Sequence, residues 1–281
     1  MFDRPVFVEF LGLSGAGKST VSHRVAEHLR SRGFPVCEPT LTLALTPGRG
    51  AVKSLHVARE LMFHPLSSLR TLKAVKATRQ RWPVLARMGF NWLMLSSLMR
   101  TQRPSLHLFD QGAFQALWSI GLEGRRGAVR HLGRRLLATV PAPELVVVIE
   151  AGARVVEQRL KLRGGRESRA DLWDSAALRR SMRTMDEVKS ILKAMSARPG
   201  GPRVVLVAND QNENAQAVAD RLAMEIERLA EETLSLRRLW VLPKREPVAL
   251  KVGVRTRVRK RREQAVAGGA SRPSRRRRWP R

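Results

Sequence analysis

The sequence predicts a three-layer α/β fold, in which a parallel sheet is covered by helices on both faces. Short, almost wholly apolar runs of strand length recur along the chain, and the clearest is Leu145–Ile149. Segments with apolar residues at helical spacing separate these runs. Because strands that are buried on both faces read as continuous apolar runs, this alternation indicates a parallel sheet with crossover helices.

Five strands and their helices form one expected domain, residues 1–235. The expected strands are Val6–Leu11, Pro35–Glu38, Leu106–Phe109, Leu145–Ile149 and Val204–Val207. A helix should follow the first strand and end at Gly33, and an irregular segment should start at Pro39. A helical insertion after the second strand, broken near two prolines, is expected at residues 51–103. The later helices are expected near 113–120, 125–139, 152–163, 171–197 and 212–235.

The chain is strongly basic, and half of its excess charge lies in one segment. Its formal net charge is +29, and residues 237–281 contain 17 Lys/Arg and 2 Asp/Glu, a net +15. This segment has no sustained apolar period, so residues 236–281 read as a disordered basic tail. Such a tail favours nucleic acid or an anionic membrane surface, or it is a solvated appendage with no specific ligand. A homodimer also stays open.

The chain shows no sign of a targeting or membrane-spanning segment. Residues 1–4 lead straight into the first strand, and no signal peptide is expected. The longest apolar stretch, MGFNWLMLSSLM at 88–99, is too short to cross a bilayer. We therefore expect a cytoplasmic protein.

The stretch GLSGAGKST, residues 12–20, fits the pattern G-x-x-x-x-G-K-[ST] of a phosphate-binding loop. Glycines allow the loop to turn its backbone N–H groups toward an anion, and the helix that follows adds its positive N-terminal end. The strand before the loop and the helix after it supply the context that the motif needs. The residues expected around the phosphates of ATP are Gly12, Ser14, Gly15, Ala16, Gly17, Lys18, Ser19 and Thr20.

The side chains of Lys18, Ser19 and Asp110 are expected to act where the parallel strands end, beside the phosphate loop. Lys18 supplies a charge for the β- and γ-phosphates, and the Ser19 hydroxyl is a ligand for Mg²⁺. Asp110 follows the third strand at the same edge, where it would lie near the Mg²⁺ ion. The alternative for Asp110 is a structural turn, which the nearby Gly112 favours.

Glu38 ends the second strand at the same edge. A carboxylate in this position is a candidate base for an acceptor hydroxyl. The alternative is a carboxylate that caps the loop after it.

The segment RLKLRGGRESR, residues 159–169, has the composition of a mobile lid. Arg159, Arg163, Arg166 and Arg169 cluster around two glycines, and clustered guanidiniums suit phosphoryl oxygens. A lid that brings arginines to the transferring phosphate would explain both residue types. The alternative is a solvated basic face. Residues 61–109 contain no Asp or Glu, so either an anionic acceptor docks there or a basic surface there meets a polyanion.

Taken together, these residues resemble the P-loop nucleoside and nucleotide kinases, most closely the thymidylate-kinase-like branch. The resemblance covers roughly residues 5–235. The Glu38-Pro39 pair resembles the Glu-Pro that ends the second strand in these enzymes, and the 159–169 arginines resemble their lid. Asp110 is followed by Gln111 where the family has an arginine, and Ser14 stands where thymidylate kinases carry a charged residue.

The resemblance implies an ATP-dependent phosphotransferase with a P-loop NTPase fold, Mg²⁺ as its metal and a small acceptor such as a nucleoside or nucleotide. Lys18, Glu38, Asp110, Arg159, Arg163 and Arg166 would be its catalytic residues, and Ser19 and Asp110 would hold the metal. Two other interpretations stay open. One is a P-loop ATPase or nucleotide-binding regulator that engages nucleic acid through the basic tail, and the other is an inactive relative of the kinases.

Overall fold

The computed structural model describes residues 2–123, 127–162, 175–209 and 215–234. The expected tail, residues 236–281, lies outside these residues, and so does most of the expected lid. Among the helices described, none combines the length and the apolar character that crossing a bilayer requires.

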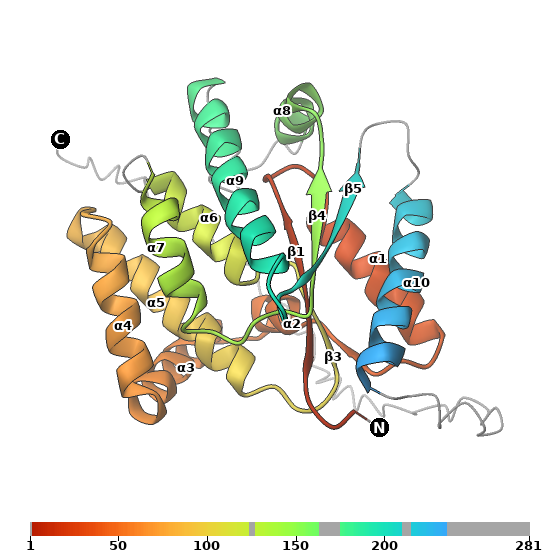
Figure 1. Cartoon of the computed structure of the whole chain (residues 1–281), viewed down its shortest axis with the longest axis horizontal. Helices are drawn as coiled ribbons and strands as arrows, with labels where there is room; N and C mark the ends of the chain where they lie inside the picture. Colours follow the sequence, from red (N-terminus) through yellow and green to blue (C-terminus); the bar gives the residue numbers. More distant parts are fainter. Residues whose placement is uncertain (1, 124–126, 163–174, 210–214, 235–281) are drawn as a thin grey trace, which may run out of the picture. The chain divides into compact units, whose positions relative to one another are not determined.

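A five-stranded, all-parallel sheet forms the centre of the described part, as the sequence predicts (Figure 1). The strand order is β2-β3-β1-β4-β5. The strands are β1 (Val6–Gly12), β2 (Val36–Cys37), β3 (Leu106–Phe109), β4 (Leu145–Glu150) and β5 (Arg203–Ala208). The carboxyl ends of parallel strands meet at one edge, where ligands bind in folds of this class.

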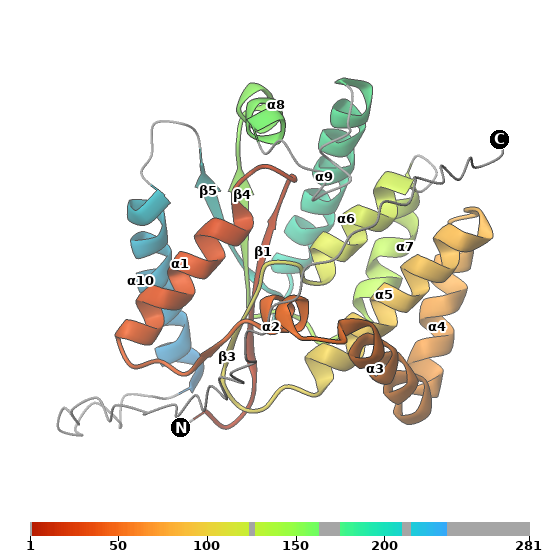
Figure 2. The ribbon, with the colours of Figure 1, turned by 180° about the vertical axis from the view of Figure 1, so that it is seen from behind.

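The helices complete the three predicted layers. On one face of the sheet α1 packs against α10, and α6, α7 and α9 lie on the other face (Figures 1 and 2). The helices are α1 (Lys18–Ser31), α2 (Pro39–Leu45), α3 (Arg49–Phe63), α4 (Pro65–Lys76), α5 (Trp82–Arg100), α6 (Ala113–Glu123), α7 (Ala128–Leu137), α8 (Ala153–Leu162), α9 (Ser175–Ser196) and α10 (Ala215–Leu234).

The insertion between β2 and β3 is helical, and it begins earlier than the sequence predicts. The expectation of an irregular segment after Pro39 is wrong for residues 39–45, which form α2. The physical reason is that proline suits the first turn of a helix, where its missing N–H has no partner in any case. The breaks predicted near Pro65 and Pro83 are present, because these prolines lie in the first turns of α4 and α5.

The core lies between the sheet and its helices. All seven residues of β1 are buried, and so are the first five of β4. The insertion is attached to this core through α5, whose Trp92 is 1% exposed. The indole Nε1 of Trp92 donates a hydrogen bond to the hydroxyl of Thr139 at 2.9 Å. Since a buried indole N–H needs a partner, this bond ties α5 to the segment between α7 and β4.

Candidate active site

The loop between β1 and α1 has the conformation that the glycine spacing predicts. Gly15 and Gly17 adopt φ values of 86° and 91°, in the left-handed region that favours glycine. A Cβ on Gly17 would also collide with the side chain of Asn209. The helix α1 begins directly after Gly17, so its N-terminal N–H groups face the loop. The fold and this loop together define a P-loop α/β protein.

Three neighbouring elements hold the loop in place. The Ala16 carbonyl accepts a hydrogen bond of 2.7 Å from the side chain of Asn209, which follows β5, and a longer one of 3.4 Å from Arg159 on α8. On the other side, the Gly12 N–H donates to the side-chain oxygen of Gln115 on α6 at 3.3 Å. The loop is therefore a preformed cradle rather than a free turn.

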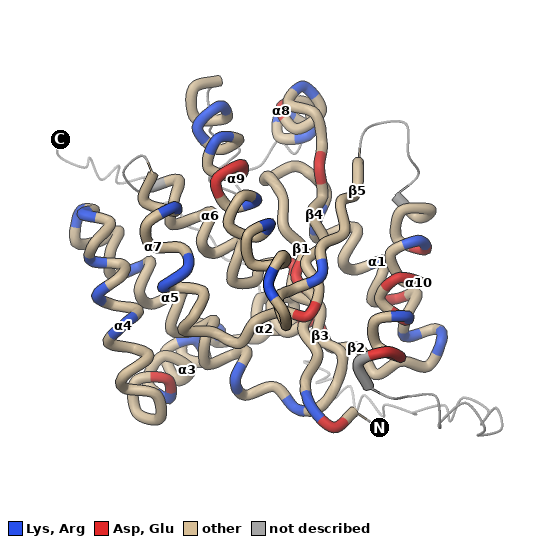
Figure 3. Tube along the Cα trace, in the orientation of Figure 1, with Lys and Arg blue, Asp and Glu red and all other residues tan. Residues whose placement is uncertain are grey.

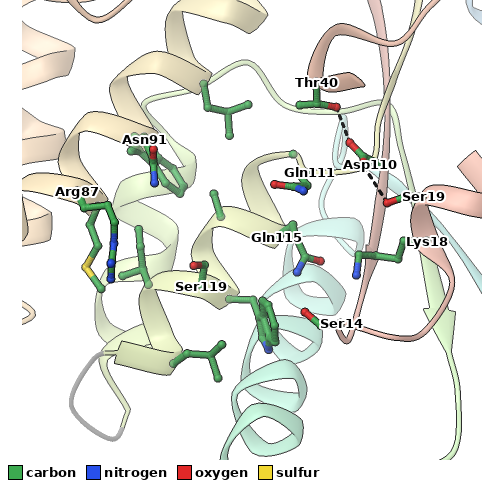
Figure 4. Close-up of a pocket in the computed structure, with 18 of the residues that line it drawn as sticks. Ser14, Lys18, Ser19, Thr40, Arg87, Asn91, Asp110, Gln111, Gln115 and Ser119 are labelled. Atoms are coloured by element: carbon green, nitrogen blue, oxygen red, sulfur yellow. Dashed lines mark hydrogen bonds between the residues drawn. The ribbon is translucent and has the colours of Figure 1, made fainter. Parts of the chain in front are cut away.

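The ammonium group of Lys18 is fixed next to the loop. Its Nζ donates hydrogen bonds to the carbonyl oxygens of Gly12 at 2.8 Å and Leu13 at 2.9 Å. Lys18 and Ser14 both line a cavity that opens beside the loop (Figure 4). This arrangement places a positive charge and the helix end together, as the binding of a polyphosphate requires.

Asp110 lies next to the first turn of α1. Its Oδ2 accepts a hydrogen bond from the Ser19 hydroxyl at 3.0 Å, and its Oδ1 accepts one from Thr40 at 2.5 Å (Figure 4). The predicted proximity of Ser19 and Asp110 is therefore present in the structure. Thr40 completes the group from the first turn of α2, the helix that the sequence did not predict.

The chemistry of these donors suits Mg²⁺. No cluster of three or more His, Cys, Asp or Glu side chains that could hold a metal occurs in the described ranges. Mg²⁺ does not need one, because it is commonly held by one or two carboxylates together with substrate phosphates and water. One hydroxyl and one carboxylate at the mouth of a phosphate loop fit this pattern.

Glu38 occupies a different environment from the one expected. Its buried carboxylate forms an ion pair with Arg30 at 2.9 Å, and its Oε1 lies 3.2 Å from Nδ1 of His23; both partners are on α1. Glu38 is not among the described residues that line the cavity, whereas Thr40, two positions later, is. The structure therefore does not bring Glu38 together with Lys18, Ser19 and Asp110.

The structure describes the first four residues of the predicted lid, 159–162. Arg159 lies in α8 and reaches the Ala16 carbonyl of the phosphate loop. Arg163, Arg166 and Arg169 lie outside the described residues. One of the lid arginines thus contacts the backbone of the phosphate loop.

The cavity next to the phosphate loop has a volume of 740 Å³. The loop forms one side, and α5 and α6 form the other (Figure 4). Apolar side chains, among them Trp92 and Leu95, alternate on its wall with the polar groups of Asn91, Gln115 and Ser119. A volume of this size holds a metabolite with a ring system.

Positive charge dominates the cavity. Among the described residues that line it, Asp110 is the one carboxylate, and the basic groups are Lys18, Lys53, Arg87 and Arg180. Arg87 and Asn91 are four residues apart on α5, so they lie on one side of the helix (Figure 4). Such a surplus of cations favours a ligand with negative charge at both ends of the cavity.

Glu9 is a buried residue of β1 that contacts the start of α6. It is 2% exposed, and its Oε1 accepts a hydrogen bond from the Gln115 N–H at 2.8 Å. Burial raises the pKa of Glu9 to about 8, although the backbone N–H groups of Gln115, Phe114 and Ala113 lower it in part. A Cβ on Gly112 would collide with this carboxyl group. Glu9 thus positions the start of α6, from which Gln115 reaches the phosphate loop.

Several site residues escaped the sequence analysis. These are Thr40, Asn91, Gln115 and Asn209, which belong to no fixed motif, whereas Arg87 lies in the segment 61–109 that the sequence analysis offered for an anionic acceptor. Two local signals existed. The first is that Gln115 lies five residues after Asp110, in the first turn of α6. The second is that Arg87 and Asn91 have the i, i+4 spacing of residues on one helix face.

Comparison with known proteins gives a limited picture. No protein-family model matches the sequence, and no curated protein does. Similar solved structures include deoxyadenosine kinase from M. mycoides with the products dCMP and dCDP, with a TM-score of 0.49 and 12% identity over 80% of this chain and 100% of that one. The same enzyme with dCTP gives a TM-score of 0.47 and 13% identity, over 79% and 100% of the two chains. At these TM-scores and identities the likeness says nothing about the activity or the substrate of this chain.

Proposed function

We propose that the chain is an ATP-dependent phosphotransferase, which moves the γ-phosphoryl group of Mg·ATP to a small acceptor in the 740 Å³ cavity. One observation carries this proposal. The phosphate loop with Lys18, the Ser19–Asp110 pair and the Arg87–Asn91 side of α5 all face the same cavity. A donor phosphate and an acceptor would meet there in the space between the loop and α5.

The residues of the loop can supply most of the catalysis. In phosphoryl transfer the protein acts mainly through positioning and electrostatic stabilisation, because little covalent chemistry is left for it. Lys18 and the N-terminus of α1 would hold the β- and γ-phosphates. Ser19 and Asp110 would hold Mg²⁺, which neutralises phosphate charge when bound.

The arginines of α8 and of the segment after it would stabilise the charge on the transferring group. Arg159 already lies beside the loop, which supports its part in the proposal. The proposed roles of Arg163 and Arg166 are based on the sequence alone. Replacing Arg163 and Arg166 together should lower kcat far more than it lowers ATP affinity.

The surroundings of Glu38 and the charge of the cavity favour an acceptor with a phosphate or carboxylate group. A nucleotide is one such acceptor. An acceptor phosphate is already a nucleophile and needs no base, so Glu38 can keep its contacts with Arg30 and His23. If the acceptor reacts through a hydroxyl group, the candidate bases are Asp110, which lines the cavity, and Glu38 after it leaves those partners.

The test is a panel of nucleosides, nucleoside monophosphates and small hydroxylated or carboxylated metabolites, each incubated with Mg·ATP and assayed for ADP and phosphorylated product. Lys18→Ala should lower the turnover at least about 100-fold. Lys193→Ala, an exposed lysine on α9 away from the cavity, is the matched control and should keep full turnover.

The result that overturns the proposal is ADP release without any phosphorylated acceptor. If nucleic acid stimulates that release, the chain is a nucleic-acid-dependent ATPase. Unchanged turnover of Lys18→Ala would remove the phosphate loop from the mechanism.

A further inference from the structure

The helices of the insertion expose apolar side chains. In the described part of the chain, nine of the twelve exposed large apolar side chains lie between Leu45 and Trp82. Soluble monomers rarely expose apolar side chains in such concentration unless a partner covers them. Four of the nine lie on α3, and three, Leu66, Leu69 and Leu72, lie on α4.

The inner side of α4 is unusually polar. Ser68 and Thr71 are both 1% exposed. The Ser68 hydroxyl donates a hydrogen bond to the Glu60 carbonyl at 3.1 Å, and the Thr71 hydroxyl donates one to the Thr139 hydroxyl at 3.1 Å. The Glu60 side chain is buried as well, in an ion pair with Arg100 at 3.2 Å. Two of the four buried residues of α4 are therefore polar and form hydrogen bonds, and the other two are Ala74 and Val75.

The outer side of α4 carries its leucines. Leu66, Leu69 and Leu72 are 72%, 48% and 42% exposed. Arg70, Lys73 and Lys76 are exposed, and each follows one of these leucines at a spacing of four, so each leucine has a basic neighbour on the helix surface. Phe63, 61% exposed, lies just before the helix starts. We call this surface the α4 face, and it consists of Phe63, Leu66, Leu69, Arg70, Leu72, Lys73 and Lys76.

The charge of the α4 face limits what can cover it. Residues 61–109 contain no Asp or Glu, and Figure 3 shows basic positions along α4. A second copy in a two-fold dimer would bring Arg70, Lys73 and Lys76 against the same cations. The chain's own residues 237–281, with a net charge of +15, would meet the α4 face with like charge too. A partner with dispersed negative charge and an apolar interior can contact both the basic and the apolar side chains of the α4 face favourably.

We propose that the α4 face binds the surface of an anionic membrane. In such a complex the leucines and Phe63 enter the boundary between headgroups and acyl chains. The basic residues, which have long flexible side chains, remain among the anionic headgroups. This inference does not depend on the phosphotransferase activity, because α4 supplies no residue to the described lining of the cavity.

The first experiment measures binding of the full-length protein to vesicles of phosphatidylcholine, alone or mixed in equal parts with phosphatidylglycerol. We expect binding to the mixed vesicles. Replacing Leu66, Leu69 and Leu72 together by Gln should weaken that binding at least about tenfold. Met224→Gln removes an exposed apolar side chain from α10, at the other end of the described domain from α4, and should not change binding (Figure 1).

The second experiment separates the α4 face from the basic segment at the C-terminus. An environment-sensitive fluorophore is attached to Leu69→Cys in a chain with Cys37→Ser, because Cys37 is exposed. Its emission should shift to the blue on mixed vesicles, and the same label on Met224→Cys should not respond.

Three outcomes overturn the proposal. The first is vesicle binding without a response of the label at position 69, which assigns the binding to another basic segment. The second is equal binding to both kinds of vesicle, or to neither. The third is a blue-shifted emission of the label at position 69 in the absence of vesicles, together with a protein of twice the monomer mass. That result would assign the α4 face to a second copy of the chain.

Discussion

The Ser19 hydroxyl donates a hydrogen bond of 3.0 Å to the Asp110 carboxylate, and this contact joins the start of α1 to the end of β3. The two residues are far apart in the sequence, and they meet because β1 and β3 are neighbours in the sheet. A hydroxyl and a carboxylate at this distance can hold one metal ion between them. Their separate contributions to activity should therefore depend on each other.

A double-mutant cycle tests this dependence. Asp110→Asn should lower kcat about 100-fold and raise the Mg²⁺ concentration needed for half-maximal rate, because the amide is a poorer metal ligand. Ser19→Ala should act in the same direction, and the double variant should lose much less than the sum of both. Asp220→Asn on α10 is the control. Fully additive losses would show that the pair does not act as a unit.

Arg87 should matter for the acceptor and not for ATP. It lines the cavity from α5, across from the phosphate loop (Figure 4). Arg87→Ala should raise the KM of an anionic acceptor by about 10- to 100-fold, the range for a lost hydrogen bond to a charged group. The KM of ATP should not change. Arg81→Ala, at the exposed start of α5, serves as control. A larger effect on ATP than on the acceptor would contradict this placement.

Glu9 should make the stability depend on pH. In the folded protein the pKa of Glu9 is about 8, against an ordinary value of 4.5. Between these pH values the folded state holds a proton that the unfolded state has released, so the free energy of unfolding falls as pH rises. The loss is on the order of a few kcal/mol over the whole window.

Replacement of Glu9 by Gln tests this expectation, because the amide resembles the protonated carboxyl and never ionises. Relative to the wild type, Glu9→Gln should gain stability steadily from pH 4.5 to pH 8, measured by urea unfolding. Glu231→Gln, exposed on α10, should show no such trend. A constant difference between Glu9→Gln and wild type would mean that Glu9 is already ionised in the folded protein.

Two glycines should respond in opposite directions to alanine. A Cβ on Gly112 would collide with the Glu9 carboxyl, which the N-terminus of α6 holds in place. Gly112→Ala should cost about 1–3 kcal/mol of unfolding free energy and reduce activity, since Asp110 is two residues away. Gly50 lies in α3 with open space around it, and Gly50→Ala should gain up to about 1 kcal/mol. Urea unfolding of both variants checks the contrast.

The sequence predicts the centre of the molecule well because its signals are local. Apolar runs mark the strands, and the glycines before Lys18 fix the loop within a few residues. The parallel sheet is confirmed. The proximity of Ser19 and Asp110 also follows from local information, since both residues adjoin strand ends at one edge.

The acceptor side could not be predicted in the same way. Arg87 and Asn91 reach the cavity only through the packing of α5, which depends on contacts such as that of Trp92 with Thr139. The apolar spacing within α5 does not report these contacts. Glu38 shows the same limit, since its position after β2 was predicted while its partners, Arg30 and His23, come from a different helix.

The central place of β1 has a consequence for synthesis. Val6 pairs with Leu106 of β3, and Val8 pairs with Leu145 of β4. A ribosome adds about 5–20 residues per second, so this first apolar strand waits roughly 10–30 s for its second neighbour. Before that time β1, which leads into the phosphate loop, cannot be paired with both β3 and β4. Until then the nascent chain exposes an apolar strand that the folded protein buries completely, and such a strand is prone to aggregate.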